Sequence, residues 1–213
     1  MKKLIKGIVG ILAIAFTGAA MAALSPEEVV RLTTEKVLER VRNEEAVLKA
    51  DTSKLYDLVN EVIIPHFDFQ KSSQLVLGKY WRQASDDQRT RFTAAFKQLL
   101  VRTYANALFQ YVDETITYKP TQASADGKVV VVPTQIEKPG GEPIPVNYRM
   151  QQKDGEWKCH DVFVNGISLV VTYRDSFASE IGQSSIDALI DHMENHNSDL
   201  ASNTVINTSG QAP

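Results

Sequence analysis

In residues 128–165, KVVVVPTQIEKPGGEPIPVNYRMQQKDGEWKCHDVFVN, apolar side chains recur with a period of two residues. This period predicts β-strands, in which successive side chains point to opposite faces. Turn motifs containing glycine separate the predicted strands, which are Thr115–Lys119, Lys128–Lys138, Pro143–Gln152 and Glu156–Asn165. Because short turns join successive strands, we expect an antiparallel meander.

The last predicted strand does not keep a single alternation. Trp157 and Cys159 occupy odd positions, whereas Val162 and Val164 occupy even positions. A β-bulge adds one residue to a strand and shifts the alternation, so we predict a bulge near His160-Asp161. We expect His160 at the surface beside this bulge, and Cys159 as a small buried hydrophobic residue.

Helical patterns flank the strands on both sides. Ser25 and Glu28 form a capping box before one long helix, and Ser85 and Gln88 form a second box before another. The predicted helices are residues 26–49, a helix that follows Asp51 and ends at Pro65, and residues 67–77, 86–111, 169–181 and 184–195. Helices and strands are segregated along the chain, which predicts an α+β fold with a twisted four-stranded antiparallel sheet wrapped by about five to seven helices.

The two ends of the chain differ from its middle. Residues 1–22 carry three lysines, then a short apolar run, then Ala20-Met21-Ala22, which is the pattern of a signal peptide cleaved after Ala22. We therefore expect export to the periplasm. Residues 23–196 are expected to form a single domain. Residues 197–213 are rich in Ser, Asn and Thr, and we expect a disordered C-terminal tail there.

The composition excludes several classes of function. The whole chain has a net charge of −3, and removal of the signal peptide with its three lysines makes the charge about −6. Nucleic-acid binding requires a basic surface, so we expect no nucleic-acid partner. Cys159 is the only cysteine in the chain, which rules out an intramolecular disulfide framework.

The sequence contains no convincing catalytic or metal-binding motif. Gly166-Ile167-Ser168 lacks the second glycine of a nucleophile elbow and is better explained as a turn at the end of a strand. His192 and His196 are four residues apart, but the pattern of a zinc-binding helix is missing, which favours a solvated helix end. We therefore do not expect this protein to be an enzyme, and we expect no metal site and no cofactor.

The apolar residues of the strands and of the helix 86–111 allow two interpretations. Either these side chains pack on each other as a filled core, or they surround an apolar cavity with the same lining. Hydrophobic periodicity is the same in both cases, so both interpretations stay open on the residues alone.

Three segments resemble the MlaC-type periplasmic phospholipid-binding proteins. These proteins are the soluble component of the Mla lipid-transport system, and the family is also known for its role in toluene tolerance. The segments are Ile64–Phe69 with Leu77–Arg82; Gln88–Phe92 with Phe96, Leu99, Leu100 and Tyr104; and Trp157–Asp161 with Val164–Val170 and Tyr173–Phe177. Asn165 and Cys159 depart from the family pattern, where we would expect aspartate and an aliphatic residue.

The resemblance implies a cavity between sheet and helices that holds the acyl chains of a phospholipid cargo. On this basis we expect the cavity wall to include Phe96, Leu99, Leu100, Tyr104, Leu108, Val130, Val132, Val146, Tyr148, Met150, Val162 and Val164. Arg149, Tyr173 and Arg174 are candidates for contacts with the head group at the rim. Two acyl chains would need a cavity of about 1,000 Å³.

The resemblance also implies partners and a physiological role. Such proteins pass phospholipid between an outer-membrane lipoprotein–porin complex and an inner-membrane ABC transporter with an MCE-domain subunit, which maintains outer-membrane lipid asymmetry. We expect a monomer. A second interpretation is a periplasmic protein-binding adaptor or chaperone with a solid core, and a third is a small enzyme that uses the cavity.

Overall fold

The structure is a computed structural model that describes residues 24–209. The predicted signal peptide at residues 1–22 and the last four residues lie outside the described part. Within residues 24–209, no helix is both long and apolar enough to cross a lipid bilayer.

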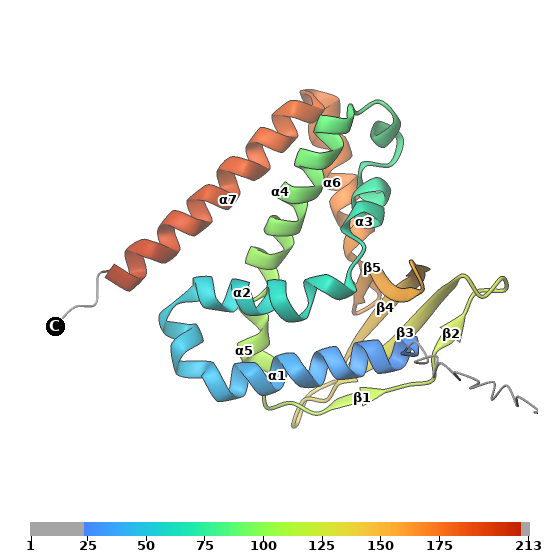
Figure 1. Cartoon of the computed structure of the whole chain (residues 1–213), viewed down its shortest axis with the longest axis vertical. Helices are drawn as coiled ribbons and strands as arrows, with labels where there is room; N and C mark the ends of the chain where they lie inside the picture. Colours follow the sequence, from blue (N-terminus) through green and yellow to red (C-terminus); the bar gives the residue numbers. More distant parts are fainter. Residues whose placement is uncertain (1–23, 210–213) are drawn as a thin grey trace, which may run out of the picture.

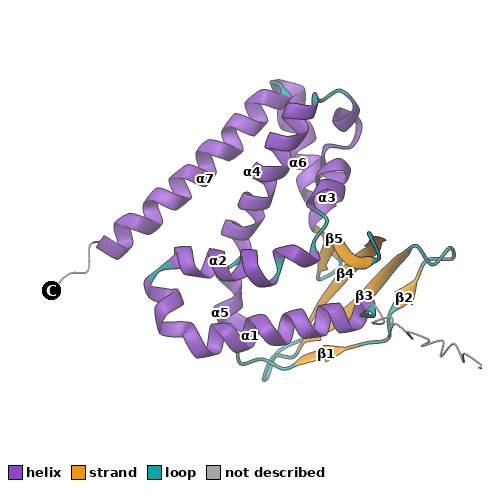
Figure 2. Cartoon of the chain, viewed as in Figure 1, coloured by secondary structure: helices purple, strands orange, loops and turns teal. Residues whose placement is uncertain are grey.

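A sheet and a helical hairpin form one part of the molecule, and a helical bundle forms the other (Figures 1 and 2). The helices are α1 (Pro26–Ala50), α2 (Thr52–Val62), η1 (Ile64–His66), α3 (Phe69–Leu77), η2 (Gly78–Arg82), α4 (Asp86–Tyr104), α5 (Ala107–Tyr111), α6 (Leu169–Gln183) and α7 (Ile186–Ser209). The strands are β1 (Ile116–Tyr118), β2 (Gln122–Ala123), β3 (Val129–Ile136), β4 (Ile144–Lys153), β5 (Glu156–Val164) and β6 (Ile167–Ser168).

The sheet confirms the predicted α+β fold and antiparallel meander. Its strand order is β1-β3-β4-β5-β6. Strand β1 pairs with residues 134–136 of β3, and β2 pairs with residues 130 and 131 of the same strand. The prediction of four strands was too low, because the described residues contain six. The two additional strands, β2 and β6, have only two residues each, which is too short for a period of two to be recognised.

The predicted bulge is present in β5. Arg149 of β4 pairs with Asp161, while the next residue, Met150, pairs with Cys159, so His160 is the extra residue. At the same point the main chain of Cys159 accepts a hydrogen bond from the Asp68 amide (2.8 Å), and the carbonyl of His160 accepts one from Ser72 Oγ (2.8 Å). The bulge therefore connects the sheet to the start of α3.

Asp161 makes the corresponding connection from the bulge to α6. Its buried carboxylate accepts hydrogen bonds from Ser168 Oγ (2.8 Å) and from the amide of Val170 (3.1 Å). Ser168 is also the N-cap of α6, where its hydroxyl accepts a hydrogen bond from the amide of Val171. A carboxylate at this end of α6 is also favoured by the helix dipole.

The bundle of α3, α4, α6 and α7 has an aromatic core. Phe92 and Phe96 of α4 stack at 5.7 Å, and the ring of Phe177 meets both edge-on at 5.9 and 6.0 Å. Leu189 and Ile190 of α7 are fully buried against this core. The N-terminal half of α4 is therefore part of the bundle rather than of the space next to the sheet.

Three predicted helix boundaries were wrong. The helix expected at residues 86–111 is broken at Ala105 and Asn106, so α4 and α5 are separate helices. The helix after Asp51 ends at Val62, and Pro65 lies within η1. The third boundary is the end of the last helix, which was expected near Asn195 but lies further along the chain.

Helix α7 instead continues to Ser209, so the prediction of disorder was wrong for residues 197–209. Asn197 shows the physical reason for the first part of this extension. It is buried, and its side-chain amide donates a hydrogen bond to the carbonyl of Ala95 on α4 (3.0 Å). A polar residue at this position therefore stabilises the packing of α7 on α4.

The predicted surface position of His160 was also wrong. The side chain is 4% exposed, and its Nδ1 atom has no hydrogen-bond partner among the described residues. Burial, reinforced by the nearby charge of Arg149, lowers the pKa of His160 to about 4. The bulge places the main chain of His160 against α3, where Ser72 donates a hydrogen bond to its carbonyl group, and the residue is buried at this junction.

Replacement of Asp161 by alanine should destabilise the protein, because it removes the acceptor shared by Ser168 and Val170. We expect the free energy of unfolding to fall by about 2–4 kcal/mol, since buried donors lose their partner. Chemical denaturation followed by circular dichroism measures this change. The control is Asp175→Ala, an exposed carboxylate that pairs with Arg174 and should change stability by less than about 0.5 kcal/mol. Equal stability of D161A and the wild type would contradict the proposed connection.

Stability should also depend on pH through His160. The folded protein keeps His160 neutral, whereas the unfolded chain takes up a proton below its ordinary pKa of 6.5. The contribution is therefore complete above pH 6.5 and is lost as the pH falls toward 4, by about 3 kcal/mol in total. H160Q should flatten this dependence, whereas the exposed H196Q should keep it. Identical pH profiles of H160Q and the wild type would disprove the assignment.

Candidate functional site

Two apolar cavities lie between the sheet and the helices that cover it. The first, here called the α1-side cavity, has a volume of about 210 Å³. The second, called the α4-side cavity, has a volume of about 290 Å³. They lie next to each other because five residues contribute to the walls of both: Ile63, Phe67, Ala107, Leu108 and Tyr148.

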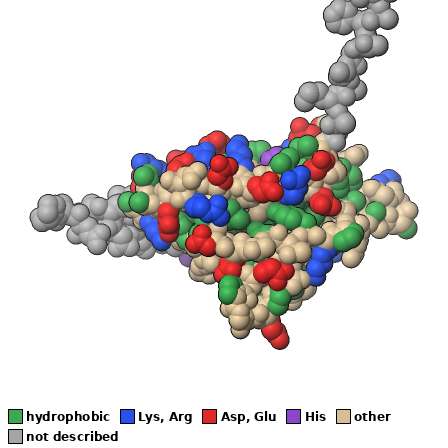
Figure 3. Space-filling model, turned by 90° about the horizontal axis from the view of Figure 1, so that it is seen from below, with side chains coloured by type: hydrophobic (Ala, Val, Ile, Leu, Met, Phe, Trp, Pro, Cys, Tyr) green, Lys and Arg blue, Asp and Glu red, His purple; other side chains and the backbone are tan. Residues whose placement is uncertain are grey.

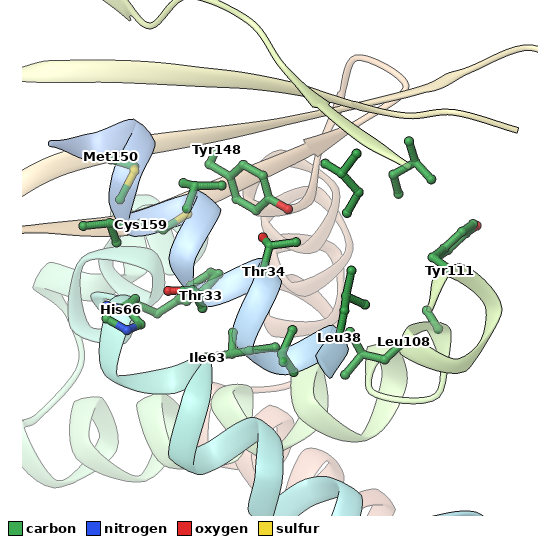
Figure 4. A pocket seen from close by; sticks show the side chains of 17 residues that line it. Thr33, Thr34, Leu38, Ile63, His66, Leu108, Tyr111, Tyr148, Met150 and Cys159 are labelled. Atoms are coloured by element: carbon green, nitrogen blue, oxygen red, sulfur yellow. The ribbon is translucent and has the colours of Figure 1, made fainter. Parts of the chain in front are cut away.

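Helix α1 supplies one wall of the α1-side cavity, and the sheet supplies the opposite wall (Figure 4). The residues that line only this cavity are Val29, Val30, Thr33, Thr34, Val37, Leu38, His66, Tyr111, Ile116, Ile136, Met150 and Cys159. The side chains of Met150 and Cys159 point from the sheet into this space (Figure 4). The bulge in β5 allows Cys159 to share this face with Met150, since the two residues are paired.

The α4-side cavity lies against the C-terminal half of α4 and the strands β4 and β5. The residues that line only this cavity are Val59, Ile64, Phe69, Leu100, Val101, Tyr104, Ala105, Val146, Val162, Val164 and Leu169. The break between α4 and α5 forms part of the wall, because Ala105 and Ala107 both line the space. Small residues at the break leave room that a continuous helix with larger side chains would fill.

Tyr148 and Leu108 stand between the two cavities. The ring of Tyr148 points from β4 toward Thr34 of α1, and Leu108 of α5 lies beside Leu38 of α1 (Figure 4). Burial raises the pKa of the Tyr148 hydroxyl well above its usual value, so this group stays protonated. Tyr148 of β4 and Leu108 of α5 thus belong to the wall that both cavities share, here called the partition.

No lining residue of either cavity is an aspartate, glutamate, lysine or arginine. Burial lowers the pKa of His66, the one lining histidine, so its neutral form is favoured. Burial also raises the pKa of the Cys159 thiol to about 12, which keeps this group neutral. The walls are therefore uncharged at neutral pH and suit hydrocarbon rather than an ionic ligand.

Apolar side chains reach the surface at two places near the cavities. Tyr104 and Val164, which line the α4-side cavity, are 42% and 37% exposed, and Ile167, which pairs with Val164, is 63% exposed. On the face seen from below, where α1 and β1 lie, hydrophobic side chains form a recess bordered by charged residues (Figure 3). Apolar side chains are therefore accessible from solvent at both places.

The structure brings eight of the twelve predicted wall residues to the cavities. They are Leu100, Tyr104, Leu108, Val146, Tyr148, Met150, Val162 and Val164. The other four lie elsewhere. Phe96 and Leu99 belong to the aromatic core of the bundle, and Val130 and Val132 belong to the same buried cluster as Val29 and Val30 of α1.

Sequence reasoning missed the contribution of α1. Thr33 and Thr34 lie between Val30 and Val37 on the apolar side of this helix, yet they are not buried as completely as the valines. The apolar stripe of α1 predicts a buried face but does not show whether that face lines a cavity. The predicted cavity volume of about 1,000 Å³ is also larger than either cavity.

The three predicted rim residues have different surroundings. Tyr173 packs on Phe96, and its hydroxyl lies 3.5 Å from that of Tyr104, beside the α4-side cavity. Arg149 lies on the opposite face of the sheet, 4.6 Å from the ring centroid of Phe163 and 3.7 Å from Asp161. Arg174 pairs with Asp175 (3.3 Å). Only Tyr173 is therefore placed next to a cavity.

The structure forms no catalytic or metal-binding group from the other candidates. The hydroxyl of Ser168 is engaged in capping α6 and in the bond to Asp161, as a turn residue at the end of a strand. His192 pairs with Glu180 (2.7 Å). Among residues 24–209, no group of three or more His, Cys, Asp or Glu side chains is arranged to hold a metal ion.

Comparisons with known proteins agree with this architecture. The family profile described as MlaC protein matches residues 31–195. The toluene tolerance protein ttg2D of Pseudomonas putida is 34% identical over 183 residues, which are 85% of this chain and 84% of the relative. The intermembrane phospholipid transport system binding protein MlaC of Haemophilus influenzae is 25% identical over 181 residues, 84% and 85% of the two chains.

A solved structure is similar over most of the fold. It is the phospholipid-binding protein from Ralstonia solanacearum in complex with a phospholipid, with a TM-score of 0.76 and 31% sequence identity. The match covers 84% of this chain and 99% of that chain. The profile match over most of the chain and the relative at 34% identity establish that this chain belongs to the MlaC family.

Proposed function

We propose that this chain is a phospholipid carrier of an Mla transport system, and that it holds the acyl chains of its cargo in the two apolar cavities. The observation that carries the proposal is the uncharged lining of these cavities in a member of the MlaC family. The relative from Ralstonia solanacearum, similar in fold, was solved in complex with a phospholipid.

The physical task of such a carrier is to keep hydrocarbon away from water. A diacyl phospholipid has about 30 methylene groups, and exposure of each costs about 0.8 kcal/mol, so unassisted passage through water costs more than about 20 kcal/mol. No bond has to be broken for this task. A lining without charged groups serves this purpose, because hydrocarbon that fills the cavity then removes water from no charged side chain.

The proposed carrier works in the periplasm after cleavage of the signal peptide behind Ala22. Its proposed partners are an outer-membrane lipoprotein–porin complex and an inner-membrane ABC transporter with an MCE-domain subunit. Relative affinity then determines whether the lipid stays on this chain or passes to a partner. We propose that it acts as a monomer and without a cofactor.

The second candidate, a protein-binding adaptor or chaperone, was based on a solid core. The cavities between sheet and helices argue against this candidate, since a filled core would leave no space lined by Leu100, Tyr148 and Val162. The third candidate, an enzyme, finds no support in the surroundings of Ser168 and His192 described above.

Protein purified from cells should contain phospholipid. Extraction with organic solvent and mass spectrometry of the extract measure the amount per chain. We expect a stoichiometric amount, because an apolar cavity open to water is less favourable than one filled with hydrocarbon. A folded protein whose extract contains no phospholipid, even after incubation with phospholipid vesicles, would favour the adaptor.

A charge placed in the α4-side cavity should prevent retention of lipid. Leu100→Arg puts a guanidinium group among uncharged side chains, and we expect the co-purified phospholipid to fall at least about tenfold. The matched control is Gln98→Arg, an exposed position on the same helix, which should retain the wild-type amount. A folded L100R protein with as much phospholipid as Q98R would show that acyl chains do not contact this wall.

A further inference from the structure

The internal space of this protein consists of two compartments rather than one. The α1-side cavity is about 210 Å³ and the α4-side cavity about 290 Å³, and five side chains line both of them. Tyr148 of β4 and Leu108 of α5 are two of the residues that line both compartments.

Neither compartment is large enough for both acyl chains of a phospholipid. Two acyl chains are expected to need about 1,000 Å³, and each cavity has less than a third of that volume. The two compartments also differ in their walls. Thr33 and Thr34 of α1 face only the first, whereas Leu100 of α4 and Val162 of β5 face only the second.

From this division we infer that a two-chain lipid places one acyl chain in each compartment, with Tyr148 and Leu108 between the two tails. The inference rests on the proposed function and specifies its ligand class. Each compartment contributes to the affinity for one tail only. The protein therefore prefers lipids with two tails over lipids with one tail, since a single-tailed lipid leaves the lining of one compartment without contact to hydrocarbon.

The side chain of Tyr148 suits the position between two tails. It lines both compartments, and its buried hydroxyl remains protonated. Leu108 and Phe67 add apolar atoms to the same partition. The tails would thus contact protein rather than each other along this part of their length.

The test measures binding of palmitoyl-oleoyl phosphatidylethanolamine and of palmitoyl lysophosphatidylethanolamine to the delipidated full-length mature protein. Thr33→Phe fills the α1-side cavity, and Leu32→Phe adds the same ring to the exposed side of α1 as the matched control. We expect T33F to bind the diacyl lipid at least about tenfold more weakly and the single-tailed lipid within about twofold of the wild type. L32F should behave as the wild type with both lipids.

The complementary pair addresses the other compartment. Leu100→Phe fills the α4-side cavity, and the exposed Gln98→Phe is its control. We expect the same selective loss of the diacyl lipid in L100F, and loss of both lipids in the double variant T33F/L100F. A diacyl affinity unchanged in either single variant would overturn the inference, because both tails would then lie in the unfilled compartment. Thermal unfolding shows which variants are folded.

A second measurement uses the wild type and does not depend on the folding of a variant. A diacyl phosphatidylethanolamine with a photoactivatable diazirine at the end of both tails is crosslinked, and the adducts are mapped by mass spectrometry. We expect adducts with α1 and with the C-terminal half of α4 in the same complexes. Adducts confined to one of these walls would overturn the inference while the proposed function stands. Absence of any phospholipid bound to the wild type would instead disprove the proposed function.

Discussion

One extra residue in β5 determines which side chains meet inside this protein. Strand alternation without the bulge at His160 would turn either Cys159 or the pair Val162 and Val164 away from the helices. With the bulge, Cys159 lines the α1-side cavity and the two valines line the α4-side cavity. The same bulge directs Asp161 toward the start of α6 and the carbonyl of His160 toward α3. The walls of both cavities and the attachment of the bundle therefore depend on a single insertion.

Strand alternation also explains which part of the site sequence analysis predicted correctly. In β4 and β5, a period of two and a bulge group Val146, Tyr148, Met150, Val162 and Val164 as apolar positions. The family resemblance implied that they line a cavity, and all five line one of the two cavities. The wall from α4 was predicted only in part. Periodicity shows that Phe96 and Leu100 are apolar positions of one helix, but it does not show that Phe96 faces α6 and α7 while Leu100 faces the sheet. The contribution of α1 was missed because its charged surroundings are typical of an ordinary amphipathic helix.

Helix α4 joins the two parts of the molecule. Its N-terminal half is held by Phe92 and Phe96 in the aromatic core of the bundle, and its C-terminal end borders the α4-side cavity until the break at Ala105 and Asn106. The rings of the bundle belong to a cluster of buried side chains, whereas the space next to the sheet contains the two apolar cavities. The close packing of the bundle thus fixes the position of α4, whose C-terminal end forms a wall of the α4-side cavity.

The position of Cys159 has a consequence for the redox chemistry of the chain. The reactive form of a cysteine is the thiolate, which forms when the thiol loses its proton. Because the pKa of Cys159 is about 12, only about one thiol in 100,000 is ionised at neutral pH. Attack on a disulfide of another protein requires that rare thiolate and access to a buried sulfur atom. Burial and the raised pKa therefore both disfavour thiol–disulfide exchange at the unpaired Cys159.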